Sequence, residues 1–123
     1  MSKKILIIED NTTDAAIAKD VLMAEGFEVD VAMTGGDGLT KAMAIKPDLI
    51  LLDLILPDAS GFDICEQLKK EEQLSDTIII ILSIKDNLDD ITKAFHVGAD
   101  DYVIKTPLPE FLARKVKLYL GQK

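Results

Sequence analysis

Short runs of apolar residues alternate with longer segments of helical periodicity along the whole chain, and this alternation narrows the possible folds more than any other feature. Between and after the runs, apolar residues recur at helical spacing, as Ile17 does with Val21 and Leu112 with Val116. Strict alternation predicts parallel strands joined by right-handed crossovers, with helices on both faces of the sheet. We therefore expect a doubly wound α/β domain. Its predicted strands are residues 5–8, 27–31, 49–52, 78–82 and 102–104.

The polarity of each run indicates where its strand lies in the sheet. Residues 78–82 are all aliphatic, as expected of a central strand that is buried on both faces. Residues 27–31 instead alternate apolar with acidic side chains, which is typical of an edge strand. In doubly wound folds the ligand site lies beyond the carboxyl ends of the strands, so the residues that follow each strand are the candidates for chemistry.

Polar residues with matched chemistry follow four of the five predicted strands. Glu9 and Asp10 follow the first, Asp53 the third, Ser83 the fourth and Lys105 the fifth. Three carboxylates in one crevice raise one another's pKa unless a cation is present. All-oxygen donors favour a hard ion, so we expect Mg²⁺ before Mn²⁺ or Ca²⁺.

A hard cation beside a lysine and a hydroxyl can neutralise and orient the oxygens of a phosphoryl group. Asp53 is the better candidate nucleophile, because Ser83 has no general base and the single histidine, His96, is predicted near the end of the fourth helix. Taken singly, each residue also has an ordinary explanation, such as an acid at a helix N-terminus or a solvated lysine. Their joint placement favours a phosphoryl site.

Composition bounds the class of protein. The 123 residues correspond to one domain, residues 1–123, and the formal net charge of -8 leads us to expect no direct nucleic acid partner and no anionic lipid. The longest apolar run is far shorter than the ~20 residues of a spanning helix, so we expect no membrane association through a transmembrane segment. The single cysteine, Cys65, fits a reducing compartment and a cytoplasmic location.

Four features of the chain resemble the receiver domain of two-component response regulators, and the likeness covers essentially its whole length. They are the pair Glu9-Asp10, the segment DLILPDASG at 53–61, Ser83, and the segment DDYVIK at 100–105. The resemblance implies the flavodoxin-like strand order 2-1-3-4-5. It also implies that Asp53 accepts a phosphoryl group from a sensor histidine kinase or a histidine phosphotransfer protein.

The same resemblance implies the roles of the surrounding residues. Glu9, Asp10, Asp53 and the backbone carbonyl of Ile55 would hold Mg²⁺. Lys105 would pair with the phosphoryl group, and Ser83 would hydrogen-bond to it. Tyr102 would then turn inward and alter the face formed by the fourth helix, fifth strand and fifth helix, where a downstream protein or fused output domain binds. The domain would be a signalling switch, not an enzyme, although it would assist its own phosphorylation and dephosphorylation.

The chain departs from the family pattern at three positions. The family usually has proline directly after the lysine, with a cis bond, whereas here Thr106 precedes Pro107. Ile84 replaces the usual small residue after Ser83, and its bulk is expected to narrow access to Asp53. Leu56 replaces the commoner methionine, a swap that preserves volume and should be mild.

Three alternatives remain open from the sequence. A Mg²⁺-dependent phosphatase with an aspartyl-phosphate intermediate needs an acid two residues after the nucleophile, where this chain has Ile55. A flavin-binding electron carrier needs a phosphate loop rich in hydroxyls and glycine after the first strand, where Glu9 and Asp10 would repel phosphate. A degenerate receiver that binds partners without phosphorylation is favoured only by Ile84 and Thr106.

Overall fold

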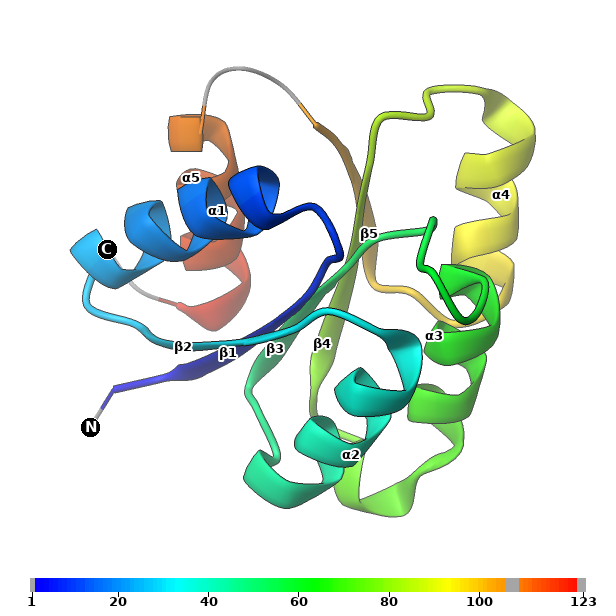
Figure 1. Cartoon of the computed structure of the whole chain (residues 1–123), viewed down its shortest axis with the longest axis horizontal. Helices are drawn as coiled ribbons and strands as arrows, with labels where there is room; N and C mark the ends of the chain where they lie inside the picture. The colour runs from blue at the N-terminus through cyan, green and yellow to red at the C-terminus, as the bar shows by residue number, and fades with distance from the viewer. Residues whose placement is uncertain (1, 106–108, 122–123) are drawn as a thin grey trace.

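The computed structural model describes residues 2–105 and 109–121, and these form a parallel sheet with the strand order β2-β1-β3-β4-β5. Helices cover both faces of the sheet, with α1 and α5 on one side and α2, α3 and α4 on the other (Figure 1). The predicted doubly wound, flavodoxin-like fold and its strand order are confirmed. The strands are β1 (Lys4–Ile8), β2 (Glu28–Ala32), β3 (Leu49–Leu52), β4 (Ile78–Ser83) and β5 (Asp101–Ile104). The helices are α1 (Thr12–Ala24), α2 (Gly35–Ile45), α3 (Gly61–Lys70), α4 (Leu88–His96) and α5 (Pro109–Leu120), with a 3₁₀ turn at Glu72–Leu74.

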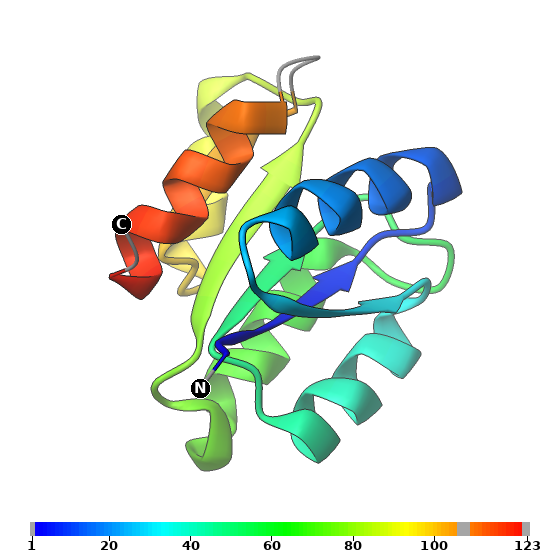
Figure 2. The same cartoon turned by 90° about the vertical axis from the view of Figure 1, so that its left-hand side faces the viewer.

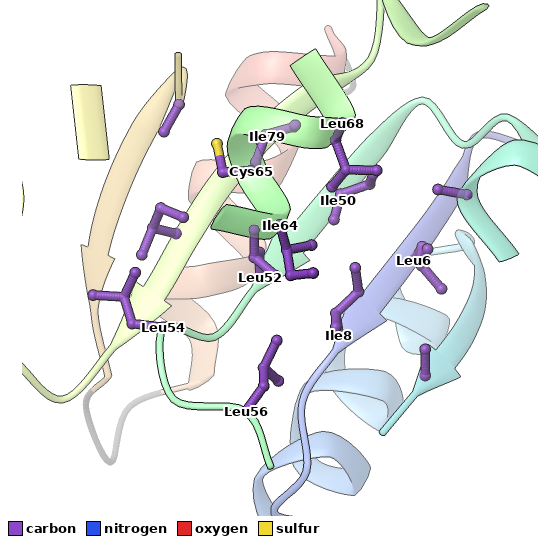
Figure 3. Packing of buried hydrophobic residues seen from close by; sticks show 14 of the residues in the cluster. Leu6, Ile8, Ile50, Leu52, Leu54, Leu56, Ile64, Cys65, Leu68 and Ile79 are labelled. Atoms are coloured by element: carbon purple, nitrogen blue, oxygen red, sulfur yellow. The ribbon is translucent and has the colours of Figure 1, made fainter. Parts of the chain in front are cut away.

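Alternate residues of each central strand enter two separate hydrophobic clusters. In β1, Ile8 packs with α2 and α3 on one face, while Ile7 packs with α1 and α5 on the other. Both side chains are buried, as the all-aliphatic strands predict. Figure 3 shows the first cluster, in which Cys65 lies among the aliphatic side chains of α3 and the sheet. The two clusters fix the sheet between its helix layers.

The ends of the elements agree with the sequence signals. Gly26 and Gly98 have φ values of 93° and 104°, which residues other than glycine rarely adopt. Each of these glycines follows the end of a helix. Lys46 takes a left-handed conformation directly before Pro47, where α2 stops. β2 lies at one edge of the sheet, as its alternating pattern predicts, although it begins one residue later than expected.

Seen from the side, the twisted sheet brings the carboxyl ends of its strands to one rim (Figure 2). α1 starts at this rim directly after β1, and the side chain of Asn11 caps it by accepting a hydrogen bond from the Asp14 amide at 2.9 Å. Within residues 2–105 and 109–121 we find no helix whose length and hydropathy would let it span a bilayer.

Candidate functional site

The predicted site residues lie at one rim of the sheet, at the carboxyl ends of β1, β3, β4 and β5. Backbone hydrogen bonds continue beyond the strands. The Asp53 amide donates to the Ile8 carbonyl at 3.0 Å, and the Lys105 amide donates to the Ser83 carbonyl at 2.8 Å. Glu9, Asp53 and Ser83 are buried, with exposed fractions of 3%, 8% and 0%. The predicted gathering of strand-end residues is therefore present in the structure.

Lys105 is at the centre of this group. Its ammonium nitrogen lies 3.2 Å from Asp53 Oδ2 and 2.5 Å from Glu9 Oε1. A third carboxylate, Asp14 Oδ2 on α1, lies 3.0 Å from the same nitrogen. Burial of Lys105 opposes its charge, but hydrogen bonds to Glu9 and Asp14 and the charge of Asp53 outweigh that effect and raise the pKa of Lys105 above its usual value. The lysine stays protonated in the site.

Negative charge nevertheless exceeds positive charge here. Carboxylate oxygens of Glu9, Asp10 and Asp53 all lie within 4.8 Å of one another. Burial, together with the hydrogen bond and the charge of Asp53, raises the pKa of Glu9 to about 7, even though Lys105 acts in the opposite direction. Hard oxygen donors that lie this close together in a partly buried site fit a divalent cation such as Mg²⁺.

The loop after β3 fixes the Asp53 side chain. Asp53 Oδ1 accepts a hydrogen bond from the Ile55 amide at 3.2 Å, and the loop closes through a bridge between Ile55 and Ser60. The side chain of Ile55 is 53% exposed, so this residue contributes to the site through its backbone. Whether its carbonyl is a metal ligand stays a prediction.

Ser83 and Tyr102 are connected through one residue between β4 and α4. Ser83 Oγ accepts a hydrogen bond from the Lys85 amide at 3.1 Å, while the Tyr102 hydroxyl donates to the Lys85 carbonyl at 2.7 Å. Burial raises the pKa of the Tyr102 hydroxyl. A displacement of Ser83 toward Asp53 would therefore disturb the anchor of the Tyr102 ring.

The three departures from the family pattern fall in different surroundings. Leu56 is buried in the core, which agrees with its replacing a methionine at little cost. Ile84 is 70% exposed, so its side chain is not packed into the protein. The bonds of Thr106 and Pro107 lie outside the described residues.

Two further acids of this rim were not predicted from the sequence. Asp14 contacts Lys105, but its position in the first turn of α1 reads as an ordinary favourable charge at a helix N-terminus. Asp58 accepts hydrogen bonds from the Gly35 and Gly36 amides at 2.7 and 2.9 Å, which ties the loop after β3 to the start of α2. These bonds lower the pKa of the Asp58 carboxyl group. Spacing along the chain gives no signal for either contact.

Comparison with known proteins gives a consistent result. Residues 5–117 match the family model described as the response regulator receiver domain. The chain is 36% identical over 120 residues to the DNA-binding response regulator MtrA of Mycolicibacterium smegmatis, covering 98% of this chain and 51% of MtrA. It is 36% identical over 112 residues to the DNA-binding dual master transcriptional regulator RpaA of Synechocystis, covering 90% of this chain and 46% of RpaA.

A solved structure agrees over almost the full chain. A receiver domain protein (CheY-like) from Methanospirillum hungatei superimposes with a TM-score of 0.91 at 32% identity, covering 98% of this chain and 95% of that one. The likeness confirms the family resemblance seen in the sequence.

The relatives also correct one expectation. From the net charge we expect no direct nucleic acid partner. That expectation is wrong, because the relatives MtrA and RpaA are described as DNA-binding. The chain spans about half the length of these curated relatives. The charge of -8 describes only these 123 residues, and says nothing about the surface of a longer protein that carries such a domain.

Proposed function

Because this chain belongs to the family of response regulator receiver domains, we propose that it receives its phosphoryl group on Asp53. The family makes the chain a phosphoacceptor signalling module of a two-component system and not a conventional enzyme. The observation that carries the choice of Asp53 is its buried carboxylate 3.2 Å from the Lys105 ammonium nitrogen. This pairing also argues against the degenerate receiver, which needs no lysine beside the acid.

The transfer requires no general base at Asp53. A carboxylate oxygen attacks the phosphorus of a phosphohistidine, the new O–P bond forms as the N–P bond breaks, and the imidazole leaves with the electron pair. Lys105 donates an N–H to the phosphoryl oxygens and offsets their charge. By the same contacts the domain assists its own phosphorylation, and it assists the later attack of water that restores the carboxylate.

We assign Glu9, Asp10, Asp53 and the Ile55 carbonyl as the ligands of Mg²⁺, with Mn²⁺ as a substitute. The support is the proximity of the three carboxylates and the raised pKa of Glu9. When bound, such an ion supplies positive charge at the phosphoryl oxygens. Asp53 remains the residue that forms the covalent bond.

The signal leaves the site through Ser83 and Tyr102 in this proposal. The support is their shared partner Lys85 and a groove over α4, β5 and α5 that Tyr102 itself lines, together with Ile104 and Phe111. Ile104 and Phe111 are 40% and 52% exposed, so this face has apolar surface for a downstream protein or fused output domain. The descriptions of MtrA and RpaA make DNA-bound regulation the leading output.

Residues 1–123 constitute one receiver domain, which the family match over residues 5–117 supports. The donor is a sensor histidine kinase or a histidine phosphotransfer protein. A cytoplasmic location fits the buried free thiol of Cys65.

Phosphorylation with a small phosphodonor and Mg²⁺ tests the proposal directly. The parent should gain one phosphoryl group as a base-labile acyl phosphate, and Asp53→Asn should gain none. Asp20→Asn, which changes an exposed acid on α1, is the matched control and should be labelled like the parent. Labelling that persists in Asp53→Asn, or a folded parent that is not labelled, would contradict the assignment.

A further inference from the structure

We propose that Asp14 is a positioning residue that holds the Lys105 ammonium group toward Asp53. This inference rests on the proposed function, because its consequence is a faster phosphorylation of Asp53. Asp14 does not belong to the predicted ligand set and would not touch the phosphoryl group. It acts only through Lys105.

The backbone of α1 determines where the Asp14 carboxylate lies. The Asp14 amide donates to the capping oxygen of Asn11 at 2.9 Å, so residue 14 is fixed in the first turn of the helix. From there Asp14 Oδ2 reaches Lys105 Nζ at 3.0 Å, across 91 residues of sequence. This contact joins the first turn of α1 to the residue that directly follows β5.

The number of donors on Lys105 gives the contact its importance. A lysine ammonium group has three N–H donors. In the structure Glu9, Asp14 and Asp53 each accept from this nitrogen, so all three donors are engaged. The orientation of the ammonium group is therefore determined by three acids from three different elements.

Phosphorylation changes only one of these three acceptors. When Asp53 becomes an acyl phosphate, the N–H that it accepted is available to the phosphoryl oxygens. Glu9 is one of the predicted metal ligands, so its carboxylate oxygens would also coordinate the cation. Asp14 is the acceptor whose sole partner among the described side chains of this rim is Lys105, and it keeps the ammonium group in place before and after the transfer.

Asp14 is also the acid of this group that can be changed most safely. Its side chain is 42% exposed, whereas those of Glu9 and Asp53 are 4% and 10% exposed. Replacing Asp14 does not remove either of the two buried acids, Glu9 and Asp53, or the packing around them. An exposed ion pair contributes little to stability, so the folded state should persist in Asp14→Ala.

The experiment compares the phosphorylation rates of Asp14→Ala and Asp14→Asn with those of the parent and of Asp20→Asn. Each of these proteins is also made with the additional substitution Lys105→Ala. With a small phosphodonor, Asp14→Ala should phosphorylate about threefold to tenfold more slowly, less than the ~100-fold that a 1 Å misplacement can cost. Asp14→Asn, which keeps an oxygen acceptor, should be intermediate. In the Lys105→Ala background the Asp14 substitution should have no further effect.

A second measurement reports on Lys105 itself in the unphosphorylated protein. The ¹H–¹⁵N signal of its ammonium group should shift and exchange faster with water in Asp14→Ala, and should stay unchanged in Asp20→Asn. Equal rates and an unchanged ammonium signal in Asp14→Ala would overturn the inference. The same loss of rate from the Asp14 substitution in the Lys105→Ala background would also overturn the inference, because Asp14 would then affect phosphorylation without acting through Lys105. A parent that is not phosphorylated would instead overturn the proposed function.

Discussion

The α-carbon of Gly61 lies directly against the carbonyl oxygen of Asp53. A Cβ atom at residue 61 would be 2.2 Å from that oxygen and 2.6 Å from the α-carbon of Leu54. The Gly61 amide also donates to the Leu54 carbonyl at 2.8 Å, so the start of α3 is held against the backbone of the candidate phosphoacceptor. Only glycine allows this approach, because both obstructing atoms belong to the backbone.

Gly61→Ala should therefore lower the free energy of unfolding by about 2–3 kcal/mol, as overpacking at a rigid site does. Gly36→Ala is the matched control, because its Cβ would meet only Asp58 Oδ2 at an ordinary 3.5 Å. That change should be neutral or stabilise the protein by about 0.5 kcal/mol. Urea unfolding of both variants is the measurement, and equal effects would contradict the steric argument.

Divalent metal should stabilise the folded protein through the acidic group. Titration with Mg²⁺ should raise the melting temperature of the parent, because a ligand that binds only the folded state shifts the equilibrium toward it. Asp10→Asn should reduce this increase while leaving the metal-free protein stable, since Asp10 is exposed. Asp20→Asn should respond like the parent, and a full response of Asp10→Asn would mean that the metal binds elsewhere.

Metal-free protein should lose stability as the pH rises from about 4.5 to about 7. The folded-state pKa of Glu9 is raised to about 7 by burial, so the folded protein retains a proton that the unfolded chain releases at its ordinary pKa of 4.5. The contribution of Glu9 to stability is therefore fully present below pH 4.5 and is lost as the pH rises through 7, which lowers the free energy of unfolding by roughly 3 kcal/mol. Chemical unfolding with a chelator present measures this slope.

Glu9→Gln should abolish the pH slope in that window, because the neutral side chain does not titrate. Asp58 and Asp101 do not interfere, since their lowered pKa values affect stability only at more acidic pH. A slope that is equally steep in Glu9→Gln would assign it to another group.

Ile84 should slow both formation and hydrolysis of the acyl phosphate, because a branched side chain next to Ser83 obstructs small donors and water. Ile84→Ala should accelerate one or both rates. The side chain is 70% exposed, so the substitution removes little packing and stability should stay close to that of the parent. Leu118→Ala, at a 78% exposed position on α5, controls for loss of surface apolar area. Unchanged rates would mean that the Ile84 side chain points away from the crevice.

The Ser83 to Tyr102 connection should carry the signal to the output face. In the parent, a phosphoryl mimic such as beryllium fluoride should shift amide NMR signals in α4, β5 and α5. In Ser83→Ala the shifts should stay near Asp53, and partner binding should lose its coupling to phosphorylation, typically ~1–3 kcal/mol. Equal spread of the shifts in both proteins would exclude the hydroxyl as part of the route.

Much of this architecture could be predicted from the sequence because the signals are local. The all-aliphatic run at residues 78–82 marks a central strand, and strand ends define where Asp53 and Lys105 must meet. The contacts of Asp14 and Asp58 could not be predicted in this way. Each joins residues far apart in the chain, and each depends on the angle at which a helix enters the rim, which hydrophobic periodicity does not determine.

The strand order divides the site between interior strands and an edge strand. Glu9 and Asp53 directly follow β1 and β3, and Ser83 is the last residue of β4; each of these strands has a neighbouring strand on both sides. Tyr102 lies within the edge strand β5, and Lys105 directly follows it. Edge strands open locally at lower free energy than strands in the interior of a sheet. Fraying of β5 can therefore withdraw the lysine and the tyrosine together while the acids keep their places. One local opening of β5 would thus separate both residues from the acids without global unfolding.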